Sequence, residues 1–205
     1  YAPIQVRGPG NVGFMTNVSQ ITSGNFNSFA LKTDGTVWAW GYNNKGRLGD
    51  GTTVNKGVPV QVVGKDGIGY LTNIKTISGG NYHTVALKTD GTVWAWGTNM
   101  YGQLGDNTVV DSHTPVPALN MNGIGYLTGI TAIAGGGDHT VALQSDRTVL
   151  TWGTNVYGQL GDNINLPRSL PVLVKGVGGV GILTDVFDIA AGPGNTMAMK
   201  RKGAV

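Results

Sequence analysis

Hydrophobic and polar residues alternate along short stretches of this chain, and turn residues separate the stretches. Residues 92–96, Thr-Val-Trp-Ala-Trp, alternate and are rich in β-branched and aromatic side chains, which favours a strand. Residues 59–63, 74–78 and 83–88 are three further stretches of strand length. No stretch keeps the period of an amphipathic helix. The pattern therefore predicts an all-β chain built from short strands.

A turn at Asp90-Gly91 predicts a hairpin between residues 83–88 and 92–96. Asp-Gly is typical of a two-residue type I′ turn, in which both residues have positive φ. Because successive strands then run up, down and up, the turn at 80–82 and the loop at 97–102 are expected to share one face. The Asp90-Gly91 turn is expected on the opposite face.

The whole pattern recurs every 56 residues without insertion or deletion, as four glycines show: Gly24, Gly80, Gly136 and Gly192. We interpret residues 1–205 as a single repeat domain with units 1–56, 57–112, 113–168 and a truncated unit 169–205. One four-stranded unit cannot bury both faces of its sheet alone, so neighbouring units must stack. The expected fold is a β-propeller with blades of about four antiparallel strands, about 3.7 blades in this chain. A β-solenoid with parallel strand pairing is the alternative.

Composition narrows the classes of function. The chain has no cysteine, which excludes disulfide, zinc-thiolate and thiol-nucleophile chemistry. Its formal net charge of +3 is too small to favour nucleic acid or an anionic membrane as a partner. We find no cleavable signal and no apolar run of transmembrane length. Low charge with many Thr, Asn and Gly residues favours an exported bacterial protein, with a cytoplasmic one as the alternative.

The candidate catalytic and cofactor-binding groups are better explained structurally. His83 and His139 lack a repeated carboxylate partner, so we interpret them as structural residues bonded to neighbouring backbone. Asp138 precedes His139, but successive strand residues point to opposite faces and cannot form a dyad. Residues 8–13 and 176–181 fit a GxGxxG pattern, yet strand-like rather than helical sequence follows both. We therefore expect no enzyme activity, no cofactor and no metal site.

We call a set of equivalent positions in successive repeats a column. Two further columns have expected structural roles. We expect the tryptophans Trp40, Trp96 and Trp152 to lie in the core between blades. We expect the aspartates that follow Leu-Gly to cap or cross-link a loop: Asp50, Asp106 and Asp162.

The repeat resembles the regulator of chromosome condensation repeat family. The shared pattern is Ile-x-x-Ile-x-x-Gly-x-x-His-Thr-x-Ala-Leu, followed by Asp-Gly-x-Val-x-x-Trp-Gly-x-Asn-x-x-Gly-Gln-Leu-Gly-Asp, and the second unit matches it from Ile74 to Asp106. Three columns depart from it. Arg47 replaces the glutamine, and Asn27 and Asn195 stand where the second and third units have histidine. Arg147 occupies the hairpin glycine column, where a side chain at positive φ costs on the order of 1 kcal/mol.

This resemblance implies a propeller of typically seven blades and functions that are nearly all protein binding. In the family these include nucleotide exchange on a small nuclear GTPase, scaffolding inside ubiquitin ligases and, in secreted bacterial members, inhibition of β-lactamase by capping its active site. We therefore expect a non-catalytic protein–protein interaction module. An inhibitor of a secreted enzyme such as a β-lactamase and a guanine nucleotide exchange factor-like protein are the alternatives.

Residues on the shared face that the scaffold does not need are the candidate partner-binding residues. Large aromatic and Met side chains at such positions fit a protein-binding surface. The candidates are Phe26, Tyr42, Lys45, Tyr82, Met100, Tyr101, Asp138 and Tyr157. An enzyme on this face would need convergent titratable groups, and the columns offer only Asp138 and Lys45. Surface aromatics without a role are the alternative interpretation.

The fourth unit lacks the strand that pairs with its predecessor and the loop that follows. An open series of blades leaves sheet edges and apolar faces uncovered. This favours a piece of a longer propeller, with a homodimer through the open propeller ends as the alternative.

Overall fold

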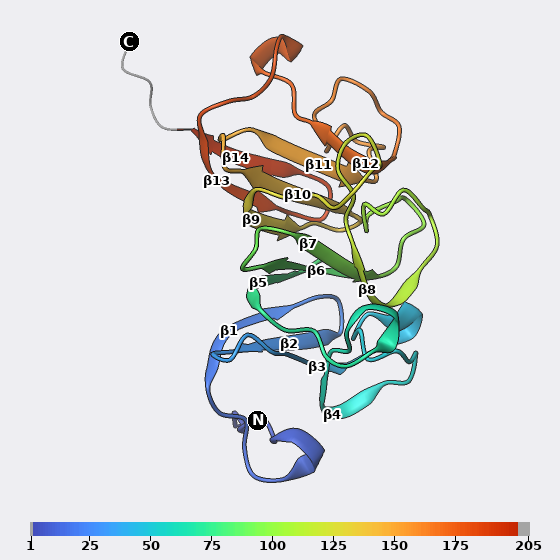
Figure 1. Cartoon of the computed structure of the whole chain (residues 1–205), viewed down its shortest axis with the longest axis vertical. Coiled ribbons are helices and arrows are strands. Elements are labelled where there is room, and N and C mark those ends of the chain that lie inside the picture. The colour runs from blue at the N-terminus through green and yellow to red at the C-terminus, as the bar shows by residue number, and fades with distance from the viewer. Residues whose placement is uncertain (1, 201–205) are drawn as a thin grey trace.

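The computed structural model describes residues 2–200 and consists of short antiparallel sheets stacked along its long axis (Figure 1). Three sheets have four strands each, in the orders β1-β2-β3-β4, β5-β6-β7-β8 and β12-β11-β10-β9, and β13 pairs with β14. Neighbouring strands in all four sheets are antiparallel. The predicted blades are therefore confirmed, and the parallel pairing of a solenoid is excluded for these sheets.

The elements are short and follow the repeat. The strands are β1 (Val18–Ser23), β2 (Asn27–Lys32), β3 (Val37–Gly41), β4 (Lys56–Gln61), β5 (Ile74–Gly79), β6 (His83–Lys88), β7 (Val93–Gly97), β8 (Ser112–Pro117), β9 (Ile130–Gly135), β10 (His139–Gln144), β11 (Val149–Gly153), β12 (Arg168–Leu173), β13 (Val186–Ala191) and β14 (Thr196–Lys200). Single 3-10 turns are η1 (Pro9–Asn11), η2 (Asn44–Gly46), η3 (Lys65–Gly67) and η4 (Val177–Gly179). Among residues 2–200, no helix has the length and apolar character needed to cross a membrane. The two GxGxxG stretches contain η1 and η4, and the next regular elements are the strands β1 and β13 rather than the helix that a dinucleotide site needs.

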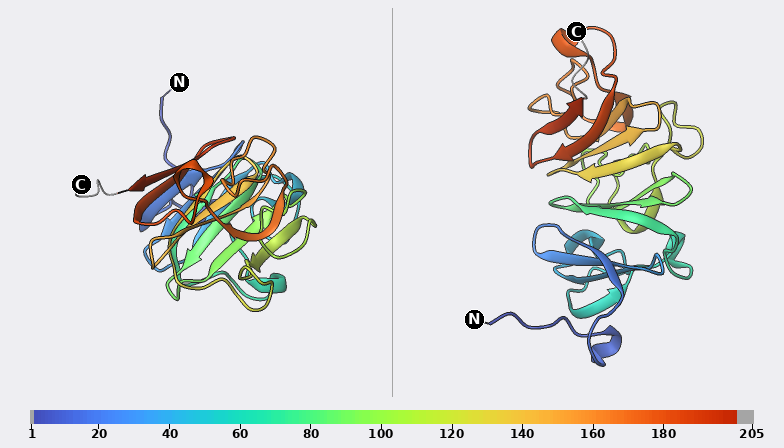
Figure 2. Two further views of the ribbon diagram at one scale, coloured as in Figure 1. Left: turned by 90° about the horizontal axis from the view of Figure 1, so that it is seen from above. Right: turned by 90° about the vertical axis from the view of Figure 1, so that its left-hand side faces the viewer.

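Successive sheets pack against one another through their first and second strands. β1 lies against β5, β5 against β9 and β9 against β13. Figure 2 shows the sheets layered over one another from the side and overlapping when seen from above. Each sheet thus covers one face of the next, which is how a four-stranded unit buries both of its faces.

The blades are offset from the sequence units. β4 opens the second unit of 56 residues, yet it pairs with β3 of the first blade, where Ala39 lies opposite Val60. In the same way, β8 lies mainly in the third unit but pairs with β7 of the second blade. β12 lies mainly in the fourth unit but pairs with β11 of the third blade. The second, third and fourth units therefore each supply the outer strand of the blade before them, which ties consecutive blades together.

The hairpin turn differs from the predicted type I′ turn. Gly91 has a φ of 81°, but Asp90 is absent from the positive-φ residues of the described chain. The amide of Gly91 donates to the carbonyl of Lys88, and the amide of Lys88 donates to the carbonyl of Thr92, as in a type I turn followed by a glycine bulge. The Asp90 carboxylate accepts bonds from the amide and hydroxyl of Thr92 at 2.9 and 2.6 Å. Asp therefore acts here as a side-chain acceptor, and only the glycine needs positive φ. Arg147 has the predicted positive φ, at 68°.

Two of the three repeated tryptophans lie in the core. Trp96 and Trp152 are fully buried, each in a hydrophobic cluster between two blades. The expectation is wrong for Trp40, which is only partly buried and lines a cavity of about 600 Å³ on the uncovered face of the first sheet. Trp40 differs because no blade precedes it among the described residues. Association of two copies through such end faces stays a prediction.

Candidate functional site

The turns before the second strand and the loops after the third strand of each blade form one surface, which we call the turn-and-loop face. It comprises turns 24–26, 80–82, 136–138 and 192–194 and loops 42–47, 98–103 and 154–159. Turn and loop are joined in each blade, because the amides of Tyr42, Thr98 and Thr154 donate to the carbonyls of Phe26, Tyr82 and Asp138 at 2.8–2.9 Å. The predicted shared face is therefore confirmed.

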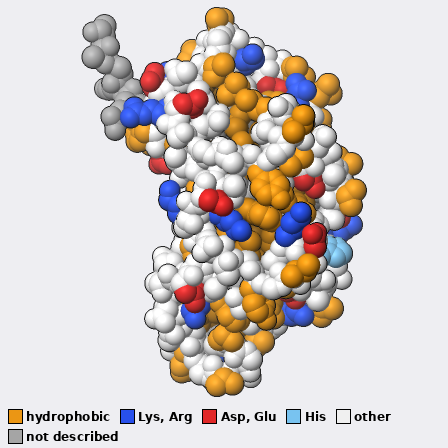
Figure 3. Space-filling view, in the orientation of Figure 1, with side chains coloured by type: hydrophobic (Ala, Val, Ile, Leu, Met, Phe, Trp, Pro, Cys, Tyr) orange, Lys and Arg blue, Asp and Glu red, His pale blue; other side chains and the backbone are white. Residues whose placement is uncertain are grey.

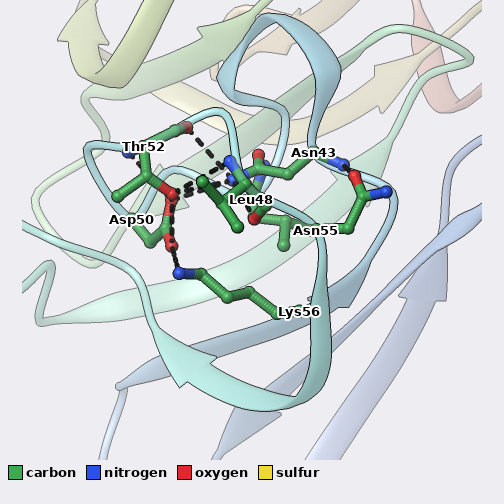
Figure 4. A network of polar contacts seen from close by, with 7 residues as sticks. Asn43, Leu48, Asp50, Thr52, Asn55 and Lys56 are labelled. Atoms are coloured by element: carbon green, nitrogen blue, oxygen red, sulfur yellow. Dashed lines mark hydrogen bonds and ion pairs between the residues drawn. The ribbon is translucent and has the colours of Figure 1, made fainter.

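A buried asparagine holds the first of these loops (Figure 4). Nδ2 of Asn43 donates to the Asp50 carboxylate at 3.0 Å and to the carbonyl of Thr52 at 3.1 Å. Its Oδ1 accepts the amide of Leu48 at 2.8 Å. Lys56 pairs with Asp50 at 3.2 Å, and hydrogen bonds from Thr52 and Asn43 lower the pKa of that carboxyl against the effect of burial. The loop is therefore cross-linked by bonds within the chain itself.

The same network recurs in the next two blades. Nδ2 of Asn99 donates to Asp106 at 3.0 Å, and Nδ2 of Asn155 donates to Asp162 at 2.9 Å. Arg168 takes the place of the lysine and pairs with Asp162 at 2.9 Å. The expectation that these aspartates cross-link a loop is confirmed.

We expect Asn43→Ala to lower the free energy of unfolding by about 3 kcal/mol, because it leaves the buried amide of Leu48 and the carbonyl of Thr52 without partners. Denaturant titration measures the change. Asn44→Ala is the matched control, since Asn44 is exposed in the same loop, and it is expected to change stability by less than about 0.5 kcal/mol. Equal losses in the two variants would contradict the anchoring role.

The end of each loop is attached to the following blade through a backbone carbonyl. The carbonyl of Arg47 accepts the indole N–H of Trp96 at 2.9 Å, and the carbonyl of Gln103 accepts that of Trp152 at 3.0 Å. The Gln103 carbonyl also accepts the hydroxyl of Thr140 at 2.8 Å. These bonds use main-chain atoms, so the side chain in this column is free to differ between blades.

In the first blade this column holds Arg47 instead of glutamine. Its guanidinium carbon lies 5.3 Å from the ring centre of Tyr42 and 4.6 Å from that of Tyr82. The residue is 7% exposed, and burial lowers the pKa of its guanidinium, which nevertheless keeps its charge. The arginine thus joins an aromatic side chain of the first blade to one of the second.

Five of the eight candidate residues gather with Arg47 around one cavity of about 340 Å³, the Arg47 pocket. The first blade contributes Lys45 and Arg47, the second Tyr82, Met100 and Tyr101, and the third Asp138. Side chains separated by almost a hundred positions in the sequence are brought together because the blades stack. On the face shown in Figure 3, hydrophobic side chains reach the surface among charges of both signs.

The charges around this pocket are partly neutralised. Lys45 Nζ lies 3.0 Å from the Asp111 carboxylate. Asp138 accepts a hydrogen bond from Nε2 of Gln103 at 3.0 Å. Burial raises the pKa of Asp138, while the charge of Arg47 and the Gln103 bond work in the opposite direction. The pocket thus combines aromatic and Met side chains with an ion pair and a hydrogen-bonded carboxylate.

The other three candidates lie outside the pocket. Phe26 packs edge-on against Tyr42 with ring centres 6.4 Å apart, and Tyr42 lies under Arg47, so both extend the same surface. Phe26 is 77% exposed and has a φ of 68°, an unusual conformation for a bulky residue. Tyr157 is 82% exposed and lines a separate cavity at the far end of the face.

Sequence reasoning missed Arg47 as a site residue. The available signal was that Arg47 breaks a glutamine column inside a loop already selected, and that arginine is enriched among the residues that dominate interface energies. The column alone could not reveal the side-chain position, which depends on Tyr82 of the next blade.

The buried histidines make different bonds from those predicted. Nε2 of His83 lies 2.9 Å from the hydroxyl of Thr140, and Nε2 of His139 lies 3.0 Å from the hydroxyl of Thr196. Their partners are thus side chains of the following blade rather than neighbouring backbone. Burial lowers the pKa of His83 to about 3 and that of His139 to about 4. Both rings are therefore neutral cross-links between blades.

Comparison with known families matches residues 34–87, 90–143 and 146–199 to the Regulator of chromosome condensation (RCC1) repeat. These stretches cover most of the chain. The chain belongs to the RCC1 repeat family. The matched stretches begin at the hairpin turns and run through the turn-and-loop face of each RCC1 repeat, so the Arg47 pocket is built from family scaffold with local departures.

Several proteins with RCC1 repeats are similar to this chain. It is 32% identical over 185 residues to the human "Probable E3 ubiquitin-protein ligase HERC6", covering 88% of this chain and 17% of that protein. It is 31% identical over 160 residues to the "Ultraviolet-B receptor UVR8" of Arabidopsis thaliana, covering 77% of this chain and 34% of the receptor. The chain thus spans 17% of the first relative and 34% of the second.

Solved structures share the fold. Prp20p of Saccharomyces cerevisiae superposes with a TM-score of 0.70 at 21% identity, over 89% of this chain and 43% of Prp20p. Human WBSCR16 superposes with a TM-score of 0.54 at 19% identity, over 92% of this chain and 60% of that protein. The stacked blades are therefore the RCC1 propeller architecture.

Proposed function

We propose that this chain is a non-catalytic protein–protein interaction module that binds its partner on the turn-and-loop face. The observation that carries the proposal is the convergence of Tyr82, Met100, Tyr101 and Arg47 from two blades on one pocket. Aromatic, Met and Arg side chains are the types enriched at the cores of protein interfaces. The loops behind them are held by buried asparagine networks, so little ordering free energy is lost on binding.

The relatives support a role in binding. Prp20p is a protein whose binding to Gsp1p and histones has been described. The pocket offers no pair of titratable groups poised for proton transfer, because Lys45 is paired with Asp111 and Asp138 accepts from Gln103. Inhibition of a secreted enzyme such as a β-lactamase and nucleotide exchange on a small GTPase would both be specialised forms of this binding and would use the same face.

Selection of short random peptides by display on the immobilised chain tests the proposal. We expect selected peptides to lose affinity about tenfold or more for Tyr101→Ala, because a partly buried aromatic anchor is removed. Tyr70→Ala is the matched control, since Tyr70 is 60% exposed and lies outside the turn-and-loop face. Peptides that bind Tyr101→Ala as tightly as the unchanged chain, or that are lost with Tyr70→Ala instead, would contradict the proposal.

A further inference from the structure

The guanidinium of Arg47 has no polar partner among residues 2–200. Its Nε is fully buried and makes no hydrogen bond. The four ion pairs of the described chain involve Lys45, Lys56, Lys65 and Arg168, and none includes Arg47. A guanidinium carries five N–H donors, and burying a charged donor without an acceptor is unfavourable. Residues 2–200 therefore supply no acceptor for this guanidinium.

The surrounding contacts hold this arginine in place without accepting hydrogen bonds from its guanidinium N–H groups. The rings of Tyr42 and Tyr82 lie beside the guanidinium, and such cation–π contacts are attractive but accept no N–H in the guanidinium plane. The backbone of Arg47 is fixed by its carbonyl, which accepts from Trp96. The guanidinium is thus held between two rings at a residue that lines the pocket.

We propose that the Arg47 pocket binds the carboxylate of an aspartate or glutamate side chain of the partner, with the Arg47 guanidinium as its principal donor. The planar fork of arginine matches the two oxygens of a carboxylate. Tyr82, Met100 and Tyr101 line the same pocket and supply apolar contact for the methylene groups of that side chain. This inference rests on the proposed function and specifies the chemistry of the partner residue.

The charges in the pocket favour a singly charged group over a phosphate. Arg47 is the unpaired cation, because Lys45 is already paired with Asp111 at 3.0 Å. Asp138 lines the same pocket, and its position is set by the bond from Gln103. Either ligand would lie near the Asp138 carboxylate, and a doubly charged phosphate would be repelled by it more strongly than a singly charged carboxylate.

A double-mutant cycle tests the assignment. The variant is Arg47→Gln, which places in the first blade the residue that the second and third blades have in this column, Gln103 and Gln159. The scaffold bonds of Arg47 use its carbonyl, so the variant is expected to fold. Peptides selected on the unchanged chain are resynthesised with each Glu replaced by Gln and each Asp by Asn. We expect one such replacement to weaken binding about tenfold or more on the unchanged chain and to have no effect on Arg47→Gln.

Peptides that bind the face but respond equally on both proteins overturn the carboxylate assignment and leave the proposed function intact. A second measurement is independent of peptide selection. The Arg47 Nε–H resonance is followed by NMR during titration with acetylated glutamate α-amide, with acetylated glutamine α-amide as the control and with inorganic phosphate. A saturating shift with the glutamate compound alone supports the assignment even where no peptide binds the face. No shift, an equal shift with the glutamine compound, or tighter binding of phosphate overturns it.

Discussion

Replacing Trp96 with alanine is expected to lower the free energy of unfolding by about 4 kcal/mol. Trp96 is fully buried between the first and second blades and packs edge-on against Phe29, with ring centres 6.5 Å apart. Its indole N–H also donates to the carbonyl of Arg47. Trp96→Ala therefore opens a cavity in the first inter-blade core and removes a bond between blades. Denaturant unfolding followed by far-ultraviolet circular dichroism measures the loss.

Trp40 provides the matched control for this variant. It occupies the same column one repeat earlier, but it is partly buried and lines the uncovered face of the first sheet. Since fewer atoms surround it, Trp40→Ala is expected to cost less than about 2 kcal/mol. Equal losses in Trp40→Ala and Trp96→Ala would show that inter-blade packing is not what makes this column important.

Acidification below pH 6.5 is expected to destabilise the chain through its two buried histidines. The pKa values of His83, about 3, and His139, about 4, lie below the ordinary histidine value of 6.5. The unfolded chain therefore binds more protons than the folded chain in this window, and stability falls as the pH falls. Each histidine contributes about 1.4 kcal/mol per pH unit, so the loss reaches about 5 kcal/mol near pH 4.5. Equilibrium unfolding at a series of pH values measures this slope.

Replacing both histidines with asparagine distinguishes their contribution to the pH dependence of stability from that of the carboxylates. Asn27 and Asn195 occupy the histidine column in the first and fourth units, so the double variant His83→Asn, His139→Asn keeps a residue that the scaffold accepts. It is expected to have a much flatter profile between pH 6.5 and 4.5. Asp138, whose pKa is raised by burial, acts in the opposite sense, but it is present in both proteins. An unchanged slope in the double variant would exclude the histidines as the cause.

Strand and hairpin positions, which depend on residues close together in the sequence, were predicted well. The alternation at 92–96 and the hairpin before it became β7 and its turn, and the shared face followed from strand direction alone. The turn type was wrong, because Asp90 accepts from Thr92 instead of adopting positive φ. Both turns close a hairpin with Asp-Gly, so the sequence did not distinguish them.

By itself, the sequence determined the all-β blade, its period and the loop-anchoring aspartates, because these depend on contacts within one repeat. It also indicated most residues around the pocket, because they lie in turns and loops that strand direction places on one face. Only the tertiary structure decided which columns meet across blades. Stacking placed Arg47 of the first blade against Tyr82 of the second and near Asp138 of the third, and it paired His83 with Thr140. It also left Trp40 partly exposed while burying Trp96. Identical columns thus acquire different environments, since the surroundings of a residue depend on the blade packed against it and not on its own repeat.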